Sequence, residues 1–283
     1  MIISEALRQG ARLIQSTGSD EARLEAELLL MHALKTDRVH LYERLQDDLP
    51  VRPSGYYQRL LNRRLAHEPT PYIVGHKEFF GLEFEVTRSA LIPRPETETL
   101  VELAIGFARD RYANDRFTIT DVGAGSGVIA VALAHALPNA RVITTDVSKR
   151  ALALTRRNAA RHGVAARIEF VEGDTLRPIQ GPVDIIASNL PYVTTDDWLA
   201  TPPEIRDWEP RGALDGGPDG LRHVRKLLRQ APEKLARHGA LFAEIGDRQG
   251  SAARSLARET FPAAEVEVRP DLAGRDRVLC VYA

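Results

Sequence analysis

The chain has 283 residues, of which 43% are hydrophobic and 27% are charged. This length suffices for about two domains with an apolar core each, which excludes a disordered or fibrous protein. Lys and Arg total 38 against 39 Asp and Glu, so the net charge of -1 excludes a global basic field for capturing nucleic acid.

The first part of the chain shows helical periodicity. Leu24, Leu28 and Met31 recur at the i, i+4 and i+7 positions of one predicted helix face. The pattern changes over 77–86, where aromatic residues alternate as in a two-stranded hairpin. These patterns predict a helical bundle over 1–73, a β-hairpin linker over 74–90 and a second domain over 91–283.

The second domain alternates short apolar strands with longer helical stretches, which predicts an α/β fold with parallel strands and crossover helices. The last two strands are only a few residues apart, so we expect them to form an antiparallel pair. The Pro- and Gly-rich stretch over 201–220 is long for a compact domain and predicts a functional loop. The expected strands span 117–122, 141–146, 167–172, 183–189, 239–246, 264–270 and 276–282, and the main helices span 128–137, 149–162 and 251–259.

Cys280 is the single cysteine, so the chain can form neither an internal disulfide nor a cysteine-based zinc site. This indicates a reducing compartment, and we expect a cytoplasmic protein without a metal. The longest stretch free of charged residues holds a continuous apolar run over 128–134 only. A membrane helix needs about 20 residues, so we expect no membrane segment.

A glycine loop, Asp-Val-Gly-Ala-Gly-Ser-Gly over 121–127, follows the first strand of the second domain and opens a helix. Glycines let the backbone approach a ligand, and helix N–H groups face its negative end. A dinucleotide fingerprint needs a third glycine where the chain has Val128, so a smaller nucleoside ligand is favoured. Asp146 ends the next strand, where its carboxylate can accept both hydroxyls of a ribose.

Two polar residues follow the third strand of this domain, Asp174 and Thr175. The pattern predicts that Asp174 lies near an adenine amino group and Thr175 against the ring edge. Alternatively, Asp174 only caps the next turn. Glu244 ends a later strand, where it could line the crevice or serve a structural purpose.

The fourth strand ends in Ser-Asn-Leu-Pro-Tyr over 188–192, at the edge where α/β sheets bind ligands. Asn189 offers an amide, Leu190 a backbone carbonyl and Tyr192 a ring face, and none is a nucleophile or a general base. Such a set can accept both hydrogens of a planar NH2 group and stack on its plane. It favours methylation of an amide or exocyclic amine by S-adenosylmethionine, where the enzyme mainly aligns the reactants. The alternative is an ordinary turn beside a core tyrosine.

The glycine loop, Asp146 and the tetrapeptide over 189–192 resemble those of class I S-adenosylmethionine-dependent N-methyltransferases. Three further segments, 91–98, 208–220 and 271–277, resemble the HemK/PrmC family, the release factor glutamine methyltransferases. The resemblance covers nearly the whole chain and implies a Rossmann-like sheet with an antiparallel C-terminal hairpin, preceded by a helical substrate-recognition domain. It also implies methyl transfer to the side-chain nitrogen of the glutamine in the Gly-Gly-Gln motif of class I peptide chain release factors.

The family's sites can be carried over to this sequence. The cofactor site then comprises Gly123, Ala124, Gly125, Ser126, Gly127, Asp146, Asp174, Thr175 and Asn189. The catalytic clamp that holds the glutamine comprises Asn189, Leu190, Pro191 and Tyr192. In this family the segment 92–96 approaches the active site, so we expect Arg94 and Glu96 to help position the glutamine-bearing loop. Alternatively, Pro95 and Glu96 only mark a helix N-terminus.

One position departs from the family pattern, which usually reads Asn-Pro-Pro-Tyr. Leu190 replaces the first proline, which restores a backbone N–H and frees φ at the residue whose carbonyl should hold the amide. The resulting Asn-Leu-Pro-Tyr is also typical of ribosomal RNA adenine dimethyltransferases. The tetrapeptide alone therefore does not separate protein from RNA substrates.

Three alternatives stay open: an adenine N6-methyltransferase acting on RNA or DNA, a ribosomal protein glutamine methyltransferase, and a non-catalytic nucleoside-binding module. The order of the chain favours the release factor enzyme, because the glycine loop follows a long helical and hairpin region instead of lying near the N-terminus. We expect a monomer that acts on release factors and contacts neither nucleic acid nor membrane.

Overall fold

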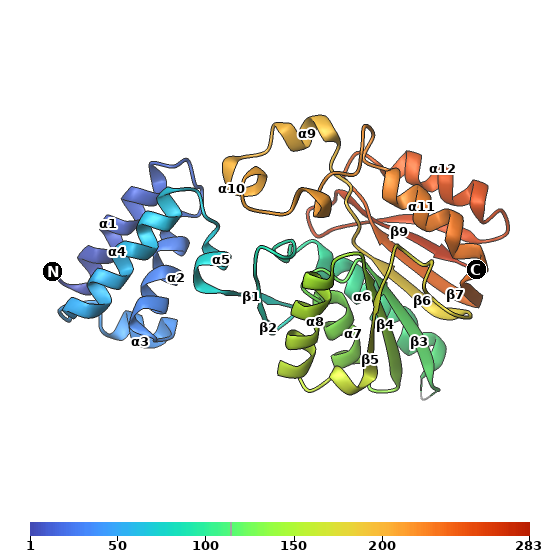
Figure 1. Cartoon of the computed structure of the whole chain (residues 1–283), viewed down its shortest axis with the longest axis horizontal. Helices are drawn as coiled ribbons and strands as arrows, with labels where there is room; N and C mark the ends of the chain where they lie inside the picture. Colours follow the sequence, from blue (N-terminus) through green and yellow to red (C-terminus); the bar gives the residue numbers. More distant parts are fainter. Residues whose placement is uncertain (114) are drawn as a thin grey trace. The chain divides into compact units, whose positions relative to one another are not determined.

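The computed structural model describes residues 1–113 and 115–283, which form two compact units (Figure 1). The helical unit comprises 1–76 together with 202–208. The sheet unit comprises 77–201 and 209–283. The chain therefore leaves the sheet unit for the short segment 202–208 and returns to it at Glu209.

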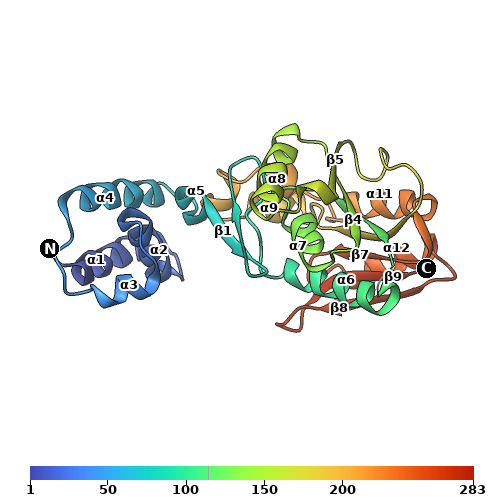
Figure 2. The ribbon, with the colours of Figure 1, turned by 90° about the horizontal axis from the view of Figure 1, so that it is seen from below.

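The helical unit is a small bundle around one apolar core (Figure 2). The helix predicted around Leu28 is confirmed as α2. On the face with the predicted periodicity Met31 packs against the core but Leu24 is 37% exposed, and Ala26 and Leu29 are fully buried. Alanines on the buried face let α2 pack closely on α1 and α4. The helices of the unit are α1 (Ile3–Gln15), α2 (Ala22–Leu34), α3 (Arg38–Glu43), α4 (Val51–Leu65), α5 (Thr70–Val74) and α10 (Pro203–Arg206).

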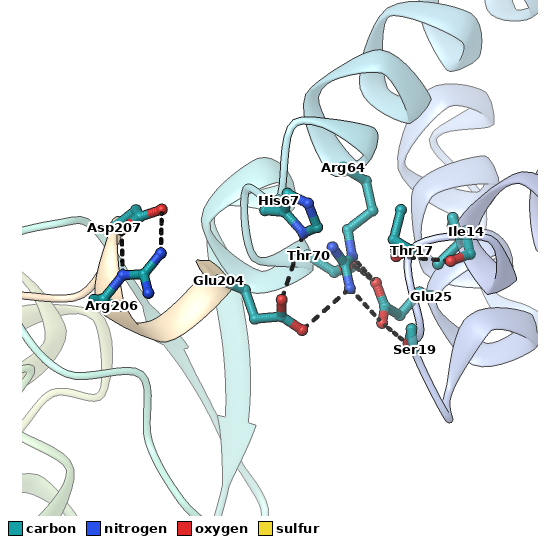
Figure 3. Close-up of polar contacts among 10 residues, drawn as sticks. All are labelled: Ile14, Thr17, Ser19, Glu25, Arg64, His67, Thr70, Glu204, Arg206 and Asp207. Carbon is teal, nitrogen blue, oxygen red and sulfur yellow. Dashed lines mark hydrogen bonds and ion pairs between the residues drawn. The ribbon is translucent and has the colours of Figure 1, made fainter. Parts of the chain in front are cut away.

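The segment 202–208 is held in the helical unit by charge (Figure 3). Its Glu204 lies 3.6 Å from a guanidinium nitrogen of Arg64 and 3.6 Å from Nδ1 of His67. The stretch over 201–220, predicted as one loop, thus divides between the two units and contains the short helices α10 and η2 (Arg211–Ala213).

The predicted hairpin consists of β1 (His76–Phe79) and β2 (Leu82–Glu85). The two residues between the strands, Phe80 and Gly81, have φ of 54° and 72°, as the tight turns of hairpins require. The hairpin is fastened to α8 (Lys149–Arg161), because the backbone N–H of Glu85 donates to Asn158 Oδ1 at 2.8 Å.

The sheet unit contains a seven-stranded sheet of order β5-β4-β3-β6-β7-β9-β8. Its strands are parallel except for β9, which runs antiparallel to both β7 and β8, so the predicted α/β fold and antiparallel C-terminal pair are confirmed. The strands are β3 (Phe117–Val122), β4 (Ala140–Asp146), β5 (Ile168–Glu172), β6 (Val183–Ser188), β7 (Leu235–Glu244), β8 (Glu265–Pro270) and β9 (Asp276–Tyr282).

Helices cover both faces of this sheet and bury a separate apolar cluster on each (Figure 1). One face carries α6 (Thr97–Tyr112), α7 (Val128–Ala136) and α8, and the other carries α11 (Arg222–Gln230) and α12 (Gly250–Thr260). The remaining short helices are α9 (Thr195–Leu199), η1 (Ala165–Arg167) and η3 (Ala231–Glu233). Within the described part of the chain, no helix combines the length and apolar character needed to cross a bilayer.

Candidate active site

The carboxyl ends of three central strands meet at one edge of the sheet. Val122, the last residue of β3, is in register with Thr145 of β4 on one side and Ser188 of β6 on the other. Strand order runs outward in both directions from β3, which makes this edge the switch point where α/β sheets bind ligands. The glycine loop and the segments beginning at Asp146 and Asn189 therefore lie next to one another.

A cavity of about 320 Å³ opens at this edge, within the size range of small-molecule sites. Eleven of the predicted site residues line it: Arg94, Gly123, Ala124, Gly125, Ser126, Asp146, Asp174, Thr175, Asn189, Leu190 and Pro191. The structure thus brings together the predicted cofactor loop and the predicted clamp. It leaves three predicted residues outside the cavity wall, namely Glu96, Gly127 and Tyr192.

The glycine loop adopts a backbone that favours glycine. Gly123, Gly125 and Gly127 have φ of 88°, 56° and 86°, in the left-handed region. A Cβ on Gly123 would lie 3.0 Å from Leu190 Cδ2, and one on Gly127 would lie 2.6 Å from Thr155 Cγ2. Gly123 therefore keeps the loop close to the clamp, and Gly127 lets α7 begin in close contact with α8.

Asp146 is held rigidly at the cavity wall. Its Oδ2 accepts a hydrogen bond from the backbone N–H of Gly125 at 3.0 Å, and its Oδ1 accepts one from Ser148 at 2.7 Å. Each carboxylate oxygen can accept a further hydrogen bond. The side chain is therefore oriented in advance for a ligand that carries two hydroxyl groups.

Asp174 lines the cavity and also binds a cation. The Lys226 ammonium donates to its Oδ2, and the Thr175 hydroxyl donates to its Oδ1 at 2.9 Å. These contacts, that of Lys226 foremost, lower the pKa of the Asp174 carboxyl. The sequence did not indicate Lys226, because it lies on α11, far along the chain from Asp174.

The predicted clamp stands on a chain of hydrogen bonds that we name the clamp network, formed by Asn189, Thr97, Glu244 and Tyr192. Asn189 Nδ2 donates to Thr97 Oγ1 at 2.9 Å, and the Thr97 hydroxyl donates to Glu244 Oε2 at 2.6 Å. The Tyr192 hydroxyl donates to Glu244 Oε1 at 3.0 Å. Burial raises the pKa of Glu244, and the two hydroxyl donors only partly offset this.

Sequence reasoning missed Thr97 and left Glu244 without a role. The available signal was a carboxylate at the end of a strand next to the switch point, where a buried charge needs partners. Thr97 gave no such signal, because a threonine in the first turn of a helix is an ordinary residue there.

The predicted substrate segment over 92–96 is fixed to the sheet unit by Glu209. One Glu209 oxygen lies 2.5 Å from an Arg94 guanidinium nitrogen, and the other accepts the backbone N–H of Ile92 at 3.0 Å. Arg94 thereby stays at the cavity wall, whereas Glu96 is exposed at the N-terminus of α6.

Comparison with known proteins first defines the class of protein to which the chain belongs. A methyltransferase from Pyrococcus furiosus has a similar fold, with a TM-score of 0.52 and 17% identity over 81% of this chain and 98% of that chain. The family model "Methyltransferase small domain" matches residues 110–200, and the model "PrmC N-terminal domain" matches residues 5–75. With the glycine loop and Asp146 at the switch point, these matches define the protein as a methyltransferase.

Two relatives then define the family. Proteins named release factor glutamine methyltransferase are 42% identical in Moorella thermoacetica, over 100% of this chain and 99% of the relative, and 42% identical in Cereibacter sphaeroides, over 99% and 98%. The chain belongs to the release factor glutamine methyltransferase family.

Proposed function

We propose that this protein transfers a methyl group from S-adenosylmethionine to the side-chain amide nitrogen of the glutamine in the Gly-Gly-Gln motif of class I peptide chain release factors. The names of its relatives point to this substrate. One observation carries the chemistry: Asn189 and Leu190, which can accept two amide hydrogens, line the same cavity as the glycine loop. The closeness of Gly123 and Leu190 supports the same arrangement.

The residues of the cofactor site fit a nucleoside with a charged tail. The glycine loop exposes backbone, Asp146 offers two oriented oxygens to a ribose, and Asp174 and Thr175 lie at the adenine end of the proposed site. Bound S-adenosylmethionine supplies an electrophilic methyl group on a sulfonium that is its own leaving group. The chain's own residues then have to bind the cofactor and the substrate, orient the two reacting groups and exclude water from the site.

The clamp residues orient the amide nitrogen. An amide nitrogen is a poor nucleophile, because its lone pair is delocalised into the carbonyl group. Asn189 Oδ1 and the Leu190 carbonyl each accept one of its hydrogens and hold them out of the usual plane, which favours attack along a fixed line. The excess proton can leave after methyl transfer, so the clamp requires no strong base.

Two clamp residues differ from what the sequence led us to expect of the clamp, Leu190 in its identity and Tyr192 in its position. The Leu190 side chain packs against the apolar cluster beneath α11 and α12, and this packing supports a carbonyl that lacks the stiffness of the usual proline. Tyr192 lies outside the cavity wall, so we propose that it acts through its hydrogen bond to Glu244 instead of stacking on the glutamine.

The other parts of the chain receive roles within the same proposal. The helical domain over 1–73 recognises the release factor, the hairpin over 74–90 links it to the methyltransferase domain over 91–283, and Arg94 and Glu96 contact the glutamine-bearing loop. The protein acts as a cytoplasmic monomer without direct contact to nucleic acid.

The experiment that tests the proposal follows a labelled methyl group. The enzyme is incubated with methyl-labelled S-adenosylmethionine and one of three substrates: a class I release factor, the same factor with alanine in place of the motif glutamine, or ribosomal RNA. We expect label in the first substrate alone, and fragment-ion mass analysis should place it on the glutamine side chain. Label in adenine, or in the alanine variant, would overturn the proposed substrate.

A further inference from the structure

Three residues from separate elements support Asn189, either by a hydrogen bond or through a residue that makes one. Thr97 begins α6, Glu244 ends β7, and Arg277 lies on β9. Glu244 is 1% exposed and does not line the cavity, so it cannot touch a substrate directly. Thr97 lines the cavity but is only 2% exposed, and its hydroxyl is engaged by Glu244 and Asn189, so we expect it to act through Asn189.

With Glu244 ionised, hydrogen-bond chemistry fixes which group donates at each step from Asn189 to Glu244. The Thr97 hydroxyl has one proton, and that proton goes to Glu244 Oε2 at 2.6 Å. The Thr97 oxygen can then only accept, so the Asn189 group that faces it at 2.9 Å must be the donor Nδ2. Asn189 Oδ1 is left over, and across residues 1–113 and 115–283 nothing donates to it.

Glu244 is in turn held as a double acceptor. Its second oxygen accepts the Tyr192 hydroxyl at 3.0 Å, so both oxygens face proton donors. The positive charge of Arg277 also favours the carboxylate, and Arg277 itself is fixed by Asp271 at 3.1 Å and by the Ile245 carbonyl at 3.4 Å. These contacts hold the Glu244 carboxylate in position to accept the hydrogen bond from the Thr97 hydroxyl.

We propose that Thr97 and Glu244 are positioning residues that lock the Asn189 carboxamide with its oxygen toward the cavity. This inference rests on the proposed function, in which Asn189 Oδ1 accepts an N–H of the substrate amide. An unlocked carboxamide could turn by half a rotation and present its own NH2 group. Two donors would then face each other, and the substrate nitrogen would lose its alignment.

The test uses a near-isosteric pair of variants. Thr97→Val keeps the shape and removes the hydroxyl, whereas Thr97→Ser keeps the hydroxyl. We expect Thr97→Val to lower kcat by about 100-fold, the scale on which a small misplacement of reactants costs rate. The Kd for S-adenosylmethionine should stay unchanged, and Thr97→Ser should restore most of kcat.

A matched control removes a buried hydroxyl elsewhere in the same sheet. Thr120 of β3 is fully buried and donates only to the Ile143 carbonyl, at 3.1 Å. Thr120→Val should leave kcat unchanged, although it removes a comparable hydrogen bond. Equal losses of kcat in Thr97→Val and Thr120→Val would reduce Thr97 to a structural residue and overturn the inference.

A second variant addresses the acceptor. In Glu244→Gln one carboxylate oxygen becomes a donor, so either Thr97 or Tyr192 loses its acceptor. We expect a smaller loss of kcat than in Thr97→Val, with an unchanged KM for the release factor. A rise in KM with kcat intact would place Glu244 in substrate binding and contradict a positioning role.

A readout independent of the substrate separates this inference from the proposed function. Nuclear magnetic resonance can follow hydrogen exchange of the Asn189 side-chain NH2 in the full chain. We expect slow exchange in the native protein and in Thr97→Ser, and fast exchange in Thr97→Val. Absence of glutamine methylation by the native enzyme would refute the proposed function, whereas fast exchange in the native protein would refute the locked carboxamide.

Discussion

Each unit of the molecule contains a largely buried polar cluster built around a glutamate, Glu25 in one and Glu244 in the other, and the two clusters differ in whether a cation binds the glutamate directly. In the helical unit, Glu25 accepts from the Arg64 guanidinium, from Ser19 at 2.5 Å and from Thr70 at 2.7 Å (Figure 3). In the sheet unit, Glu244 has two hydroxyl partners, and its hydrogen bonds lead through Thr97 to Asn189, a residue that lines the cavity.

The pKa values express the same difference. Burial would raise the pKa of Glu25, but hydrogen bonds from Arg64, Ser19 and Thr70 outweigh it and lower that pKa below its ordinary value. Burial dominates at Glu244 and raises its pKa. The cluster in the helical unit thus favours the charged form of its glutamate, whereas the clamp network does not, as expected if the network serves the proposed function at a cost in stability.

The largest expected effect comes from the open end of the clamp network. Asn189→Ala removes the acceptor that the substrate amide needs, so methyl transfer should fall by at least about 10³-fold, beyond the loss typical of one oxyanion-hole donor. Binding of S-adenosylmethionine should persist in part, because the glycine loop and Asp146 stay in place. Turnover assays with purified release factor and calorimetric titration of the cofactor measure both. Turnover at the native rate would remove the clamp from the mechanism.

The next largest effect is on the cluster around Glu25. Arg64 is buried, and Arg64→Ala leaves the Glu25 carboxylate without its cation, which should cost about 3–5 kcal/mol of unfolding free energy. Urea unfolding measures it, and Arg8→Ala, on the exposed face of α1, serves as the control with an expected change within about 0.5 kcal/mol. Similar unfolding free energies for the two variants would contradict a stabilising role of the cluster.

The two glutamates should also respond to pH in opposite directions. Glu25 has a lowered pKa, so its stabilisation is present above the ordinary value of 4.5 and is lost as pH falls through its folded pKa. Glu244 has a raised pKa, so its contribution is present below 4.5 and is lost as pH rises through its folded pKa. At pH 7, Glu25→Gln should therefore cost about 1–3 kcal/mol, and Glu244→Gln should cost nothing or stabilise. Unfolding curves at pH 7 and pH 4 test this, and the same sign for both variants at pH 7 would be the wrong result.

The smallest effect belongs to an exposed ion pair. Arg157 Nε and Glu85 lie 2.8 Å apart, with side chains 52% and 37% exposed. Arg157→Ala should cost about 1 kcal/mol or less, and added salt should reduce that cost further. Thermal unfolding at low and high salt measures it. A cost as large as that of Arg64→Ala would mean that burial is not what separates strong pairs from weak ones here.

Local sequence patterns predicted much of the fold and of the candidate site. The glycine loop, Asp146 and the segment over 189–192 follow strands, and strand ends meet at one edge whatever the details of packing, so the shared cavity was predictable. The hairpin around Gly81 was also predictable, because two-residue turns have strong composition signals.

The remainder depended on contacts between distant parts of the chain. The partners Thr97, Glu209 and Lys226 lie far along the sequence from the residues they hold, and no local pattern marks them. Glu244 was marked by its place at a strand end, but its partners were not. Which side of α2 is buried was also not marked locally, because its apolar residues surround most of the helix, and Ala26 and Leu29 are among its fully buried residues. The placement of 202–208 in the helical unit likewise involves Arg64, which lies 140 residues before its partner Glu204 in the sequence.

A crystal structure of the enzyme with S-adenosylhomocysteine and a peptide containing the Gly-Gly-Gln motif tests the central claim most directly. We predict that the glutamine nitrogen lies between Asn189 Oδ1 and the Leu190 carbonyl, within hydrogen-bond distance of both, and faces the cofactor sulfur. A sulfur atom bound away from Gly123, or a glutamine that contacts neither acceptor, would contradict the account.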